Sequence, residues 1–185
     1  MPVLRKLFPA EWDRYERHLL RLDPHSRLMR FAGNTSDAAI TQRCRTLDHG
    51  RTVIVGCFVQ GELRGAVEIA VDRTLWPRDA ELAFSLEAPF QGLGLGAVLM
   101  ERALTIVRNR RIRRIHMLCL HENRRMRALV RRFGGALTFD GGELLAVFDL
   151  PPPNHLSLAV EAMEDGAGAV GAWLSAIAPT ERFAA

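Results

Sequence analysis

A glycine-rich turn between a strand-like stretch and a helix-like stretch constrains this chain more than any other feature. Residues 86–100 read LEAPFQGLGLGAVLM, with glycines at positions 92, 94 and 96. Glycine permits positive φ and lets the backbone approach a ligand closely. The first turn of a helix adds unpaired N–H groups at the positive end of its dipole. The segment therefore predicts a cradle for a diphosphate, and the absence of a lysine after Gly96 excludes a Walker loop.

Two diphosphate-bearing ligands are compatible with this turn. A dinucleotide is one, because Gly92, Gly94 and Ala97 fit the pattern G-x-G-x-x-G/A and Glu122 ends the next predicted strand, where a ribose-binding acid would lie. Residues 87–91, however, separate the strand from the first glycine, and too little chain follows Glu122 for the second half of a dinucleotide fold. An acyl-coenzyme A is the other ligand.

Length and composition limit the class of protein. The chain has 185 residues, of which 48% are hydrophobic and 25% charged, as expected for one globular domain with an appendage. The longest apolar run, Thr52–Val59, is too short to cross a bilayer. The N-terminal sequence MPVLRKLFPAEW lacks the apolar core of a signal peptide, so we expect a cytoplasmic protein without a membrane partner.

Apolar periodicity predicts a mixed α/β fold, with a sheet covered by helices on both faces. Segment 25–34 is expected to be a loop, because Asp23-Pro24 breaks the preceding helix, and Asp140-Gly141-Gly142 predicts a hairpin turn. The expected strands are 3–8, 52–59, 63–71, 80–86, 112–120, 136–139 and 143–150, and the expected helices are 10–21, 38–48, 97–108 and 124–133.

Three prolines at positions 151–153 predict the end of a domain over residues 1–150, followed by a helical tail over residues 151–185. The tail carries apolar residues at alternating steps of four and three, which is typical of a helical seam. This seam either docks on its own domain or pairs with a second copy in a homodimer. Glycines weaken an isolated helix and favour the first alternative. The seam residues are Leu156, Val160, Met163, Ala167, Val170, Leu174 and Ile177.

Three segments together resemble the GNAT superfamily of N-acetyltransferases, in particular its bacterial protein-lysine acetyltransferase-type domains. Residues 91–96, QGLGLG, match the Q/R-x-x-G-x-G/A loop of that family. Asn123 and the helix ending at Phe133-Gly134 are similar to its N-x-x-A-x-x-L-Y-x-x-x-G-F segment, and HLLRLDPHSRLMRF looks like its first helix and acceptor-side loop. The resemblance covers residues 3–150. It implies a mostly antiparallel sheet flanked by helices, acetyl-CoA as cosubstrate, and acetyl transfer to a primary amine of a protein or a small molecule.

The resemblance also implies site residues. A backbone N–H near residues 84–86, at a bulge, would stabilise the thioester oxyanion. Arg27, Arg30 and Phe31 would lie on the acceptor side, where the arginines favour a carboxylate-bearing partner. The implied coenzyme-binding residues are Phe84, Ser85, Leu86, Gln91, Gly92, Leu93, Gly94, Leu95, Gly96, Ala97, Asn123 and Met126.

An amine acceptor needs a base, because a lysine-type amine with a pKa of about 10.4 is mostly protonated at neutral pH. Glu81 is the candidate, since it shares one strand face with Ala83 and Ser85 and resembles a glutamate base of the histone-acetyltransferase branch. A carboxylate paired with an arginine at the sheet edge is the alternative interpretation of Glu81.

One position departs from the family pattern. Val130 occupies the slot of the tyrosine that usually protonates the leaving thiolate, and the only tyrosine of the chain is Tyr15. Water or the outgoing amine would then protonate the thiolate. A catalytically silent acyl-CoA-binding module is the alternative function that this departure favours.

The remaining charged and metal-binding residue types predict no further site. Arginine accounts for all basic residues except Lys6, and the runs at 108–114 and 124–132 would suit a nucleic acid, but no aromatic residue interleaves them for base stacking. Solvated helix faces are the simpler interpretation. His116 lies on the strand face opposite to Cys119 and His121, so we expect no metal ion. Cys44, Cys57 and Cys119 are expected to be reduced thiols.

Overall fold

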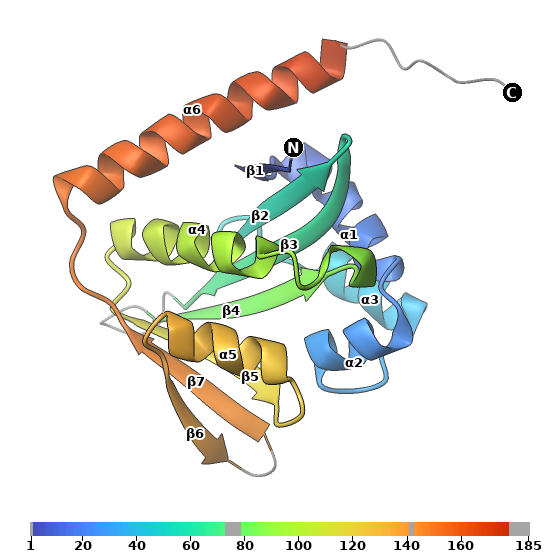
Figure 1. The fold of residues 1–185 in the computed structure, drawn as a ribbon. Helices are drawn as coiled ribbons and strands as arrows, with labels where there is room; N and C mark the ends of the chain where they lie inside the picture. The colour runs from blue at the N-terminus through green and yellow to red at the C-terminus, as the bar shows by residue number, and fades with distance from the viewer. Residues whose placement is uncertain (1, 73–78, 141–142, 178–185) are drawn as a thin grey trace, which may run out of the picture.

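One seven-stranded sheet forms the centre of the described part of the molecule (Figure 1). The computed structural model describes residues 2–72, 79–140 and 143–177, so the predicted connection at Trp76-Pro77 and the predicted turn residues Gly141 and Gly142 lie outside the described residues. The strand order is β1-β2-β3-β4-β5-β7-β6. The strands are β1 (Val3–Lys6), β2 (Thr52–Val59), β3 (Glu62–Val71), β4 (Asp79–Leu86), β5 (Arg114–Leu120), β6 (Ala136–Asp140) and β7 (Glu143–Asp149).

Helices cover both faces of this sheet, which confirms the predicted fold class. One face carries α1, α2 and α3, and the other carries α4 and α5, while α6 extends along the β1 side (Figure 1). The helices are α1 (Trp12–Leu20), α2 (Pro24–Phe31), α3 (Asp37–Arg45), α4 (Leu95–Asn109), α5 (Arg124–Arg132) and α6 (His155–Ile177), with 3-10 turns η1 (Pro9–Glu11) and η2 (Ala88–Phe90).

Two apolar cores hold the layers together. The larger core packs β2–β5 and β7 against α4 and α5, with Leu99, Ile106 and Ile115 fully buried. The smaller core packs α1 and α3 against β2 and β3, around Leu19 and Ile40. Alternation along the strands divides their side chains between the two cores. Each face of the sheet is therefore sealed independently.

Segment 25–34 corrects a sequence prediction, because most of it is helical rather than a loop. Helix α2 begins at Pro24, and the Asp23 carboxylate accepts hydrogen bonds from the Ser26 backbone N–H at 3.0 Å and from the Ser26 hydroxyl at 2.6 Å. Proline fits the first helical position because its missing N–H would be unpaired there anyway. Asp23-Pro24 thus ends one helix and caps the next.

Helix α6 contacts the body of the molecule through polar side chains. Lys6 of β1 donates to Glu161 at 2.5 Å and to Asp165 at 2.6 Å, and Arg102 of α4 pairs with Asp165 at 2.5 Å. A Cβ at Gly168 would lie 2.8 Å from the Cβ of Arg5, so the helix passes β1 closely at this glycine. The tail docks on its own domain as expected, but by its polar face rather than by its apolar seam.

No helix in the described ranges is long and apolar enough to cross a membrane.

The cap of α2 generates a stability prediction. We expect Asp23→Ala to lower the free energy of unfolding by about 1 kcal/mol, because two donors of Ser26 lose their acceptor. Chemical denaturation followed by circular dichroism measures this change. Asp149→Ala is the control, since Asp149 forms an exposed ion pair with Arg114 and its loss should cost no more than about 0.5 kcal/mol. Equal losses in the two variants would contradict the capping role.

Candidate functional site

Strands β4 and β5 begin side by side and then part. They pair in parallel at three register positions, Asp79↔Arg114, Ala80↔Ile115 and Glu81↔His116. Beyond Glu81, β4 continues to pair only with β3, whereas β5 pairs with β7 along its whole length. The edge of β4 that follows Glu81 is consequently not covered by a neighbouring strand.

The backbone amides on this edge follow from the alternation of hydrogen bonds in an antiparallel ladder. Glu87 N–H donates to Arg64 of the β3 side at 3.0 Å, and the register continues regularly from Leu86↔Gly65 to Ala80↔Val71. Odd-numbered residues of β4 therefore direct their amides toward β3. The amides of Phe84 and Leu86 point the other way, toward the side that β5 has left.

The expected bulge in β4 is absent, which corrects the predicted cause of this separation. The register of β3 with β4 has no shift over the paired residues, and the register shift of this region lies between Cys57 and Phe58 in the β2–β3 ladder. The strands part because the parallel β4–β5 ladder ends after its third pair, not because β4 is bulged.

The glycine turn lies directly beyond the end of β4. Gly92 and Gly94 adopt φ values of 77° and 82°, and a Cβ at either position would have no other atom within 4 Å. Both the backbone conformation and the open space require or favour glycine there. Gly96 differs, because it lies in the first turn of α4 without positive φ and has ordinary room for a methyl group. Two of the three glycines therefore shape the cradle.

Helix α4 presents its first amides toward the same place. Gly94 is its N-cap, and its carbonyl accepts the first helical hydrogen bonds from Ala97 at 3.0 Å and from Val98 at 3.3 Å. The amides of Leu95 and Gly96 precede these bonds. They stand at the positive end of the helix dipole, next to the open backbone of Gly92 and Gly94, which is the geometry that binds a phosphate group.

Gln91 connects this turn to three other elements. Its side-chain amide nitrogen donates to the Leu86 carbonyl at 2.8 Å and to the Ser26 hydroxyl of α2 at 3.0 Å. Its side-chain oxygen accepts a hydrogen bond from Arg125 of α5. Because these contacts occupy the side chain, Gln91 positions the turn, and only its backbone faces outward.

Glu81 lies at the point where the two strands part. It is exposed, it pairs in register with Ala70 and His116, and it shares its strand face with half-buried Ala83 and buried Ser85. The neighbouring His116 ring nitrogen lies 3.1 Å from the Asp79 carboxylate. A solvent-accessible carboxylate therefore stands beside the uncovered edge of β4, as a base for an amine would require.

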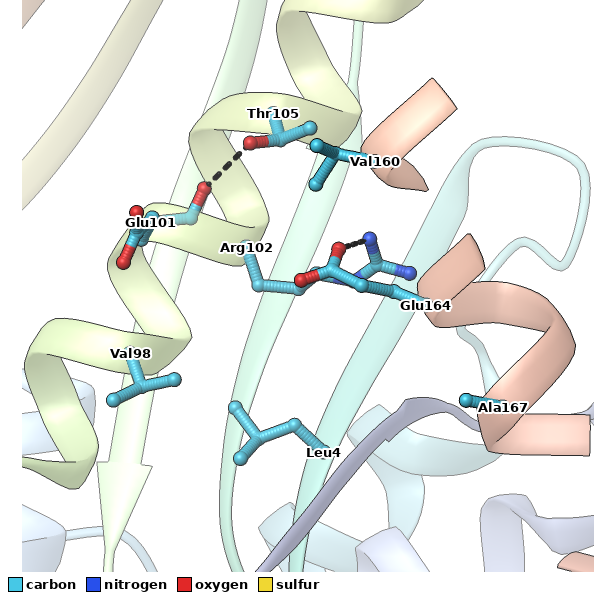
Figure 2. Close-up of a pocket in the computed structure, with 8 residues that line it drawn as sticks. All are labelled: Leu4, Val98, Glu101, Arg102, Thr105, Val160, Glu164 and Ala167. Atoms are coloured by element: carbon cyan, nitrogen blue, oxygen red, sulfur yellow. Dashed lines mark hydrogen bonds and ion pairs between the residues drawn. The ribbon is translucent and has the colours of Figure 1, made fainter. Parts of the chain in front are cut away.

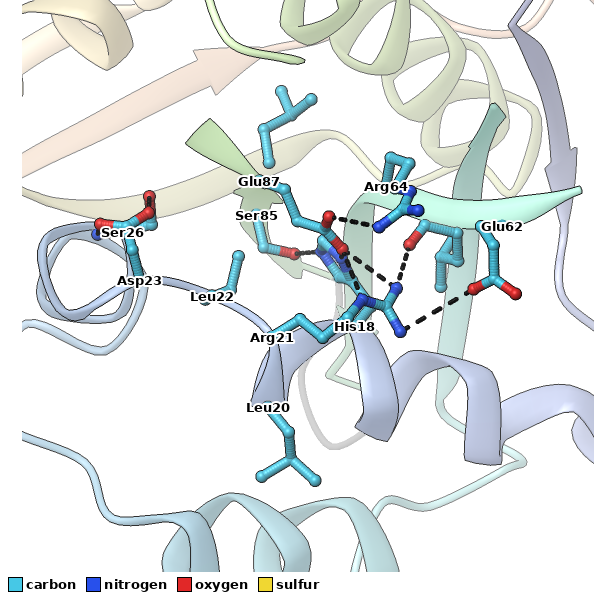
Figure 3. A network of polar contacts seen from close by, with 12 residues as sticks. His18, Leu20, Arg21, Leu22, Asp23, Ser26, Glu62, Arg64, Ser85 and Glu87 are labelled. Atoms are coloured by element: carbon cyan, nitrogen blue, oxygen red, sulfur yellow. Dashed lines mark hydrogen bonds and ion pairs between the residues drawn. The ribbon is translucent and has the colours of Figure 1, made fainter. Parts of the chain in front are cut away.

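A buried polar network behind this edge had no signal in the sequence (Figure 3). His18 of α1 is fully buried, and its two ring nitrogens lie 2.9 Å from Ser85 Oγ and 3.2 Å from Glu87 Oε1. Glu87 also accepts hydrogen bonds from Arg21 at 3.0 Å and from Arg64 at 2.9 Å. The network ties the end of β4 to α1 and β3, and Ser85, an implied coenzyme-binding residue, has its hydroxyl engaged by His18.

The ionisation states in this network follow from burial and pairing. Burial opposes the charged form of Glu87, but hydrogen bonds from His18, Arg64 and Arg21 outweigh it and lower the Glu87 pKa to about 2. Burial lowers the pKa of His18, and the Glu87 carboxylate only partly opposes this effect. At neutral pH the network therefore holds an ionised Glu87 and a neutral His18.

The acceptor-side residues that the resemblance implied have internal partners. Arg27 donates to Asp37 at 2.5 Å and to the Leu20 and Leu22 carbonyls. Arg30, with only 6% of its side chain exposed, donates to Glu68 at 3.0 Å, and Phe31 packs against the smaller core. Their contacts hold α2 on the sheet, and a role in acceptor binding stays a prediction.

The segment after β5 shows what occupies the family's tyrosine slot. Asn123 caps α5 by accepting from the Met126 amide at 3.0 Å, and Met126 packs against the larger core. Val130 is fully buried in that core. Tyr15 donates to Glu68 at 2.8 Å, and burial raises its pKa. Neither Val130 nor Tyr15 therefore supplies a proton to a leaving group at the edge of β4.

Cysteines and metal-binding residue types form no additional centre in the described residues. Cys44, Cys57 and Cys119 are unbonded thiols, as their odd number predicted. Within residues 2–72, 79–140 and 143–177, no three His, Cys, Asp or Glu side chains gather as a site for a metal ion.

Comparison with known proteins gives consistent matches. The model of the acetyltransferase (GNAT) family matches residues 5–135. An acetyltransferase of Pseudomonas aeruginosa is 28% identical over 139 residues, which cover 71% of this chain and 73% of that protein. The GNAT domain of S. lividans PAT has a TM-score of 0.67 at 22% identity and covers 80% of this chain and 89% of that one. The PaiA N-acetyltransferase of Thermoplasma acidophilum, solved with coenzyme A, has a TM-score of 0.61 at 16% identity and covers 81% and 99%.

The buried network generates a pH-dependent prediction. Glu87→Gln should lower the free energy of unfolding at pH 7 by on the order of 2 kcal/mol, because the carboxylate that stabilises the native state above its unfolded pKa is lost. The difference from the wild type should shrink as the pH falls from about 4.5 toward about 2, where the native carboxylate itself is protonated. Denaturation midpoints across this pH range measure it.

Glu62→Gln is the matched control, because Glu62 faces the same Arg21 at 3.9 Å but its side chain is 58% exposed. Its loss should change stability by no more than about 0.5 kcal/mol. A Glu87→Gln difference that does not depend on pH would contradict the assigned ionisation of Glu87.

Proposed function

The chain belongs to the acetyltransferase (GNAT) family, and from this premise we propose that it transfers an acetyl group from acetyl-CoA directly to a primary amine. The observation that carries the proposal is the parting of β4 from β5 beside the glycine turn. It leaves backbone amides along β4 and at the start of α4 facing the same side of the sheet. The PaiA N-acetyltransferase with bound coenzyme A, which shares this fold, supports an amine as the acceptor class.

The residues present fit acetyl-CoA at two places. The open backbone of Gly92 and Gly94 with the first amides of α4 would hold the diphosphate. The amides of Phe84 and Leu86 would hydrogen-bond the pantetheine arm and the thioester oxygen. When bound, acetyl-CoA supplies an acetyl group activated as a thioester. The side chains of Gln91 and Asn123 would keep the turn and α5 in position around it.

Glu81 is proposed as the base. Its exposed carboxylate would take a proton from the acceptor ammonium, directly or through water, so that the nitrogen lone pair can attack the thioester carbon. A β4 amide would stabilise the negative charge that develops on the carbonyl oxygen. The C–S bond then breaks, and the electron pair leaves with sulfur. With Val130 in the tyrosine slot, the second proton of the amine, or water, would protonate the thiolate.

A catalytically silent acyl-CoA-binding module is the second candidate, and buried Val130 is the observation that favours it. Two measurements separate the candidates. Calorimetric titration with acetyl-CoA tests binding, and release of the coenzyme A thiol in the presence of a panel of amines tests turnover. Binding with amine-dependent thiol release supports the transferase, whereas binding without release supports the silent module.

The glycine turn generates the first functional prediction. Gly94→Ala should weaken acetyl-CoA binding about tenfold or more, because a methyl group would face the approaching diphosphate and a non-glycine residue at φ 82° strains the turn by about 1–2 kcal/mol. Calorimetry measures the dissociation constant. Gly61→Ala is the matched control, since Gly61 has φ 78° and open space but lies in the β2–β3 turn. Equal affinities in both variants would remove the turn from the binding site.

The proposed base generates the second prediction. Glu81→Gln should reduce kcat about 10²–10⁴-fold while the KM for acetyl-CoA stays the same, because the amide keeps the shape of the side chain but accepts no proton. Steady-state kinetics across pH measure this, and the acid limb that Glu81 produces should disappear. Glu62→Gln, at an exposed carboxylate of β3, should leave kcat unchanged. An unaltered pH–rate profile in Glu81→Gln would exclude Glu81 as the base.

A further inference from the structure

Helix α6 faces the body of the molecule with one polar side. The residues of this side recur every three to four positions, as Ser157, Glu161, Asp165 and Gly168, and they are buried or half-buried. Ser157 donates to Asn109 of α4 at 2.6 Å, and the Asn109 side chain in turn donates to Glu161 at 2.7 Å. The contact that holds α6 is thus made of hydrogen bonds and ion pairs.

The apolar seam of α6 lies on a flank of the helix that its own domain leaves uncovered. Leu156, Met163 and Val170 are 72%, 75% and 58% exposed, and Val160 is 37% exposed. At 3.6 residues per turn, the centre of this seam lies roughly 120° around the helix from the polar side. The 4–3 spacing that is typical of helix–helix pairing is therefore present, but the body of the chain does not use it.

Charge excludes a lipid surface as the natural occupant of this flank. The acidic residues of α6 are Glu161, Glu164 and Asp165, and all three pair with Lys6 or Arg102 of the same chain. The outer flank carries no charge. Interfacial membrane helices instead present lysines and arginines beside their apolar face. An uncharged flank also lacks the repulsion that would keep two copies of the chain apart.

A groove runs beside the seam, between α6 and α4 (Figure 2). It has a volume of about 210 Å³, which is enough to receive a methionine or leucine side chain. In Figure 2, Val160, Glu164 and Ala167 of α6 face Val98, Glu101, Arg102 and Thr105 of α4, and Leu4 of β1 completes the lining.

The spacing selects an antiparallel arrangement of two α6 helices. Antiparallel pairing sets Met163 of one copy against Ala167 of the other, beside the groove, and sets Val160 against Val170. Parallel pairing would instead stack Met163 on Met163 and Ala167 on Ala167, which would leave a gap at the alanines. A large side chain meets a small one in each antiparallel layer at Met163, and the groove gives that side chain a place.

We propose that the outer flank of α6 is a dimer interface, on which α6 of a second copy of this chain packs antiparallel and inserts Met163 into the α4–α6 groove. Such an interface is isologous, with each copy providing the same patch. A 23-residue helix is about 35 Å long, and pairing along it would bury on the order of 1,000 Å² in total, which is the lower range for a specific, reversible dimer.

Sedimentation of the full chain over a wide concentration range tests this proposal. The wild type should form dimers, and Met163→Glu should raise the dimer dissociation constant about 10–100-fold, because a charge would enter an apolar groove. Val98→Glu, on the α4 wall, should act in the same direction. Leu158→Glu is the matched control, since Leu158 is 49% exposed on the same helix but lies away from the seam, and it should leave the constant unchanged.

A second measurement tests the orientation. In a Val160→Cys, Val170→Cys double variant, oxidation of the dimer should join position 160 of one copy to position 170 of the other, which peptide mapping identifies. Disulfides between equal positions would contradict the antiparallel pairing. A wild type that stays monomeric, or that binds neutral phospholipid vesicles in a Met163-dependent way instead of dimerising, would overturn the proposal. Circular dichroism of each variant verifies that α6 and the domain remain folded.

Discussion

The short parallel ladder between β4 and β5 is the constraint on which the rest of the site depends. It ends at Glu81↔His116, and from there each strand keeps a partner on one edge only. A longer ladder would use the amides of Phe84 and Leu86 in strand pairing, and no backbone donor would remain for a ligand. The same ending places Glu81 at the junction, exposed, with the glycine turn at the far end of the uncovered edge. Backbone donors, a carboxylate and a phosphate cradle thus follow from one interruption of a sheet.

An uncovered strand edge must be held from behind, and the arginine-rich composition of the chain provides for this. Glu87 is shared by Arg21 and Arg64, and Glu68 by Arg30 and Arg43, so that each buried carboxylate joins two guanidinium groups from different elements. Guanidinium forks suit such sharing because their several N–H groups are fixed in one plane. The arginines that looked like an acceptor-side signature, Arg30 above all, take part in this support. Glu81 stands outside these networks and stays accessible.

The tail helix repeats the same division between polar support and an open surface. Its acids and Ser157 hold it against β1 and α4, which leaves its apolar seam on the outside. A seam of this kind on a helix that is already fixed in place loses little conformational entropy when it pairs. The glycines that would weaken an isolated helix are tolerated because the ion pairs of Lys6 and Arg102 support it.

The sequence by itself determined the features that local pattern encodes: the order of strands and helices, the glycine turn before α4, the cap at Asn123 and the shared face of Glu81 and Ser85. These depend on periodicity and on backbone preferences that act within a few residues. Pattern failed at α2, where Asp23-Pro24 fits both a break and a helix start, and at the bulge expected in β4. Only the tertiary structure decided which side chains meet across the fold. His18 and Glu87 are 69 positions apart, and Arg30 reaches Glu68 rather than solvent, because the layers bring together residues that no local rule relates. Which flank of α6 faces inward was likewise decided by the positions of Lys6 and Arg102, not by the apolar seam of the helix.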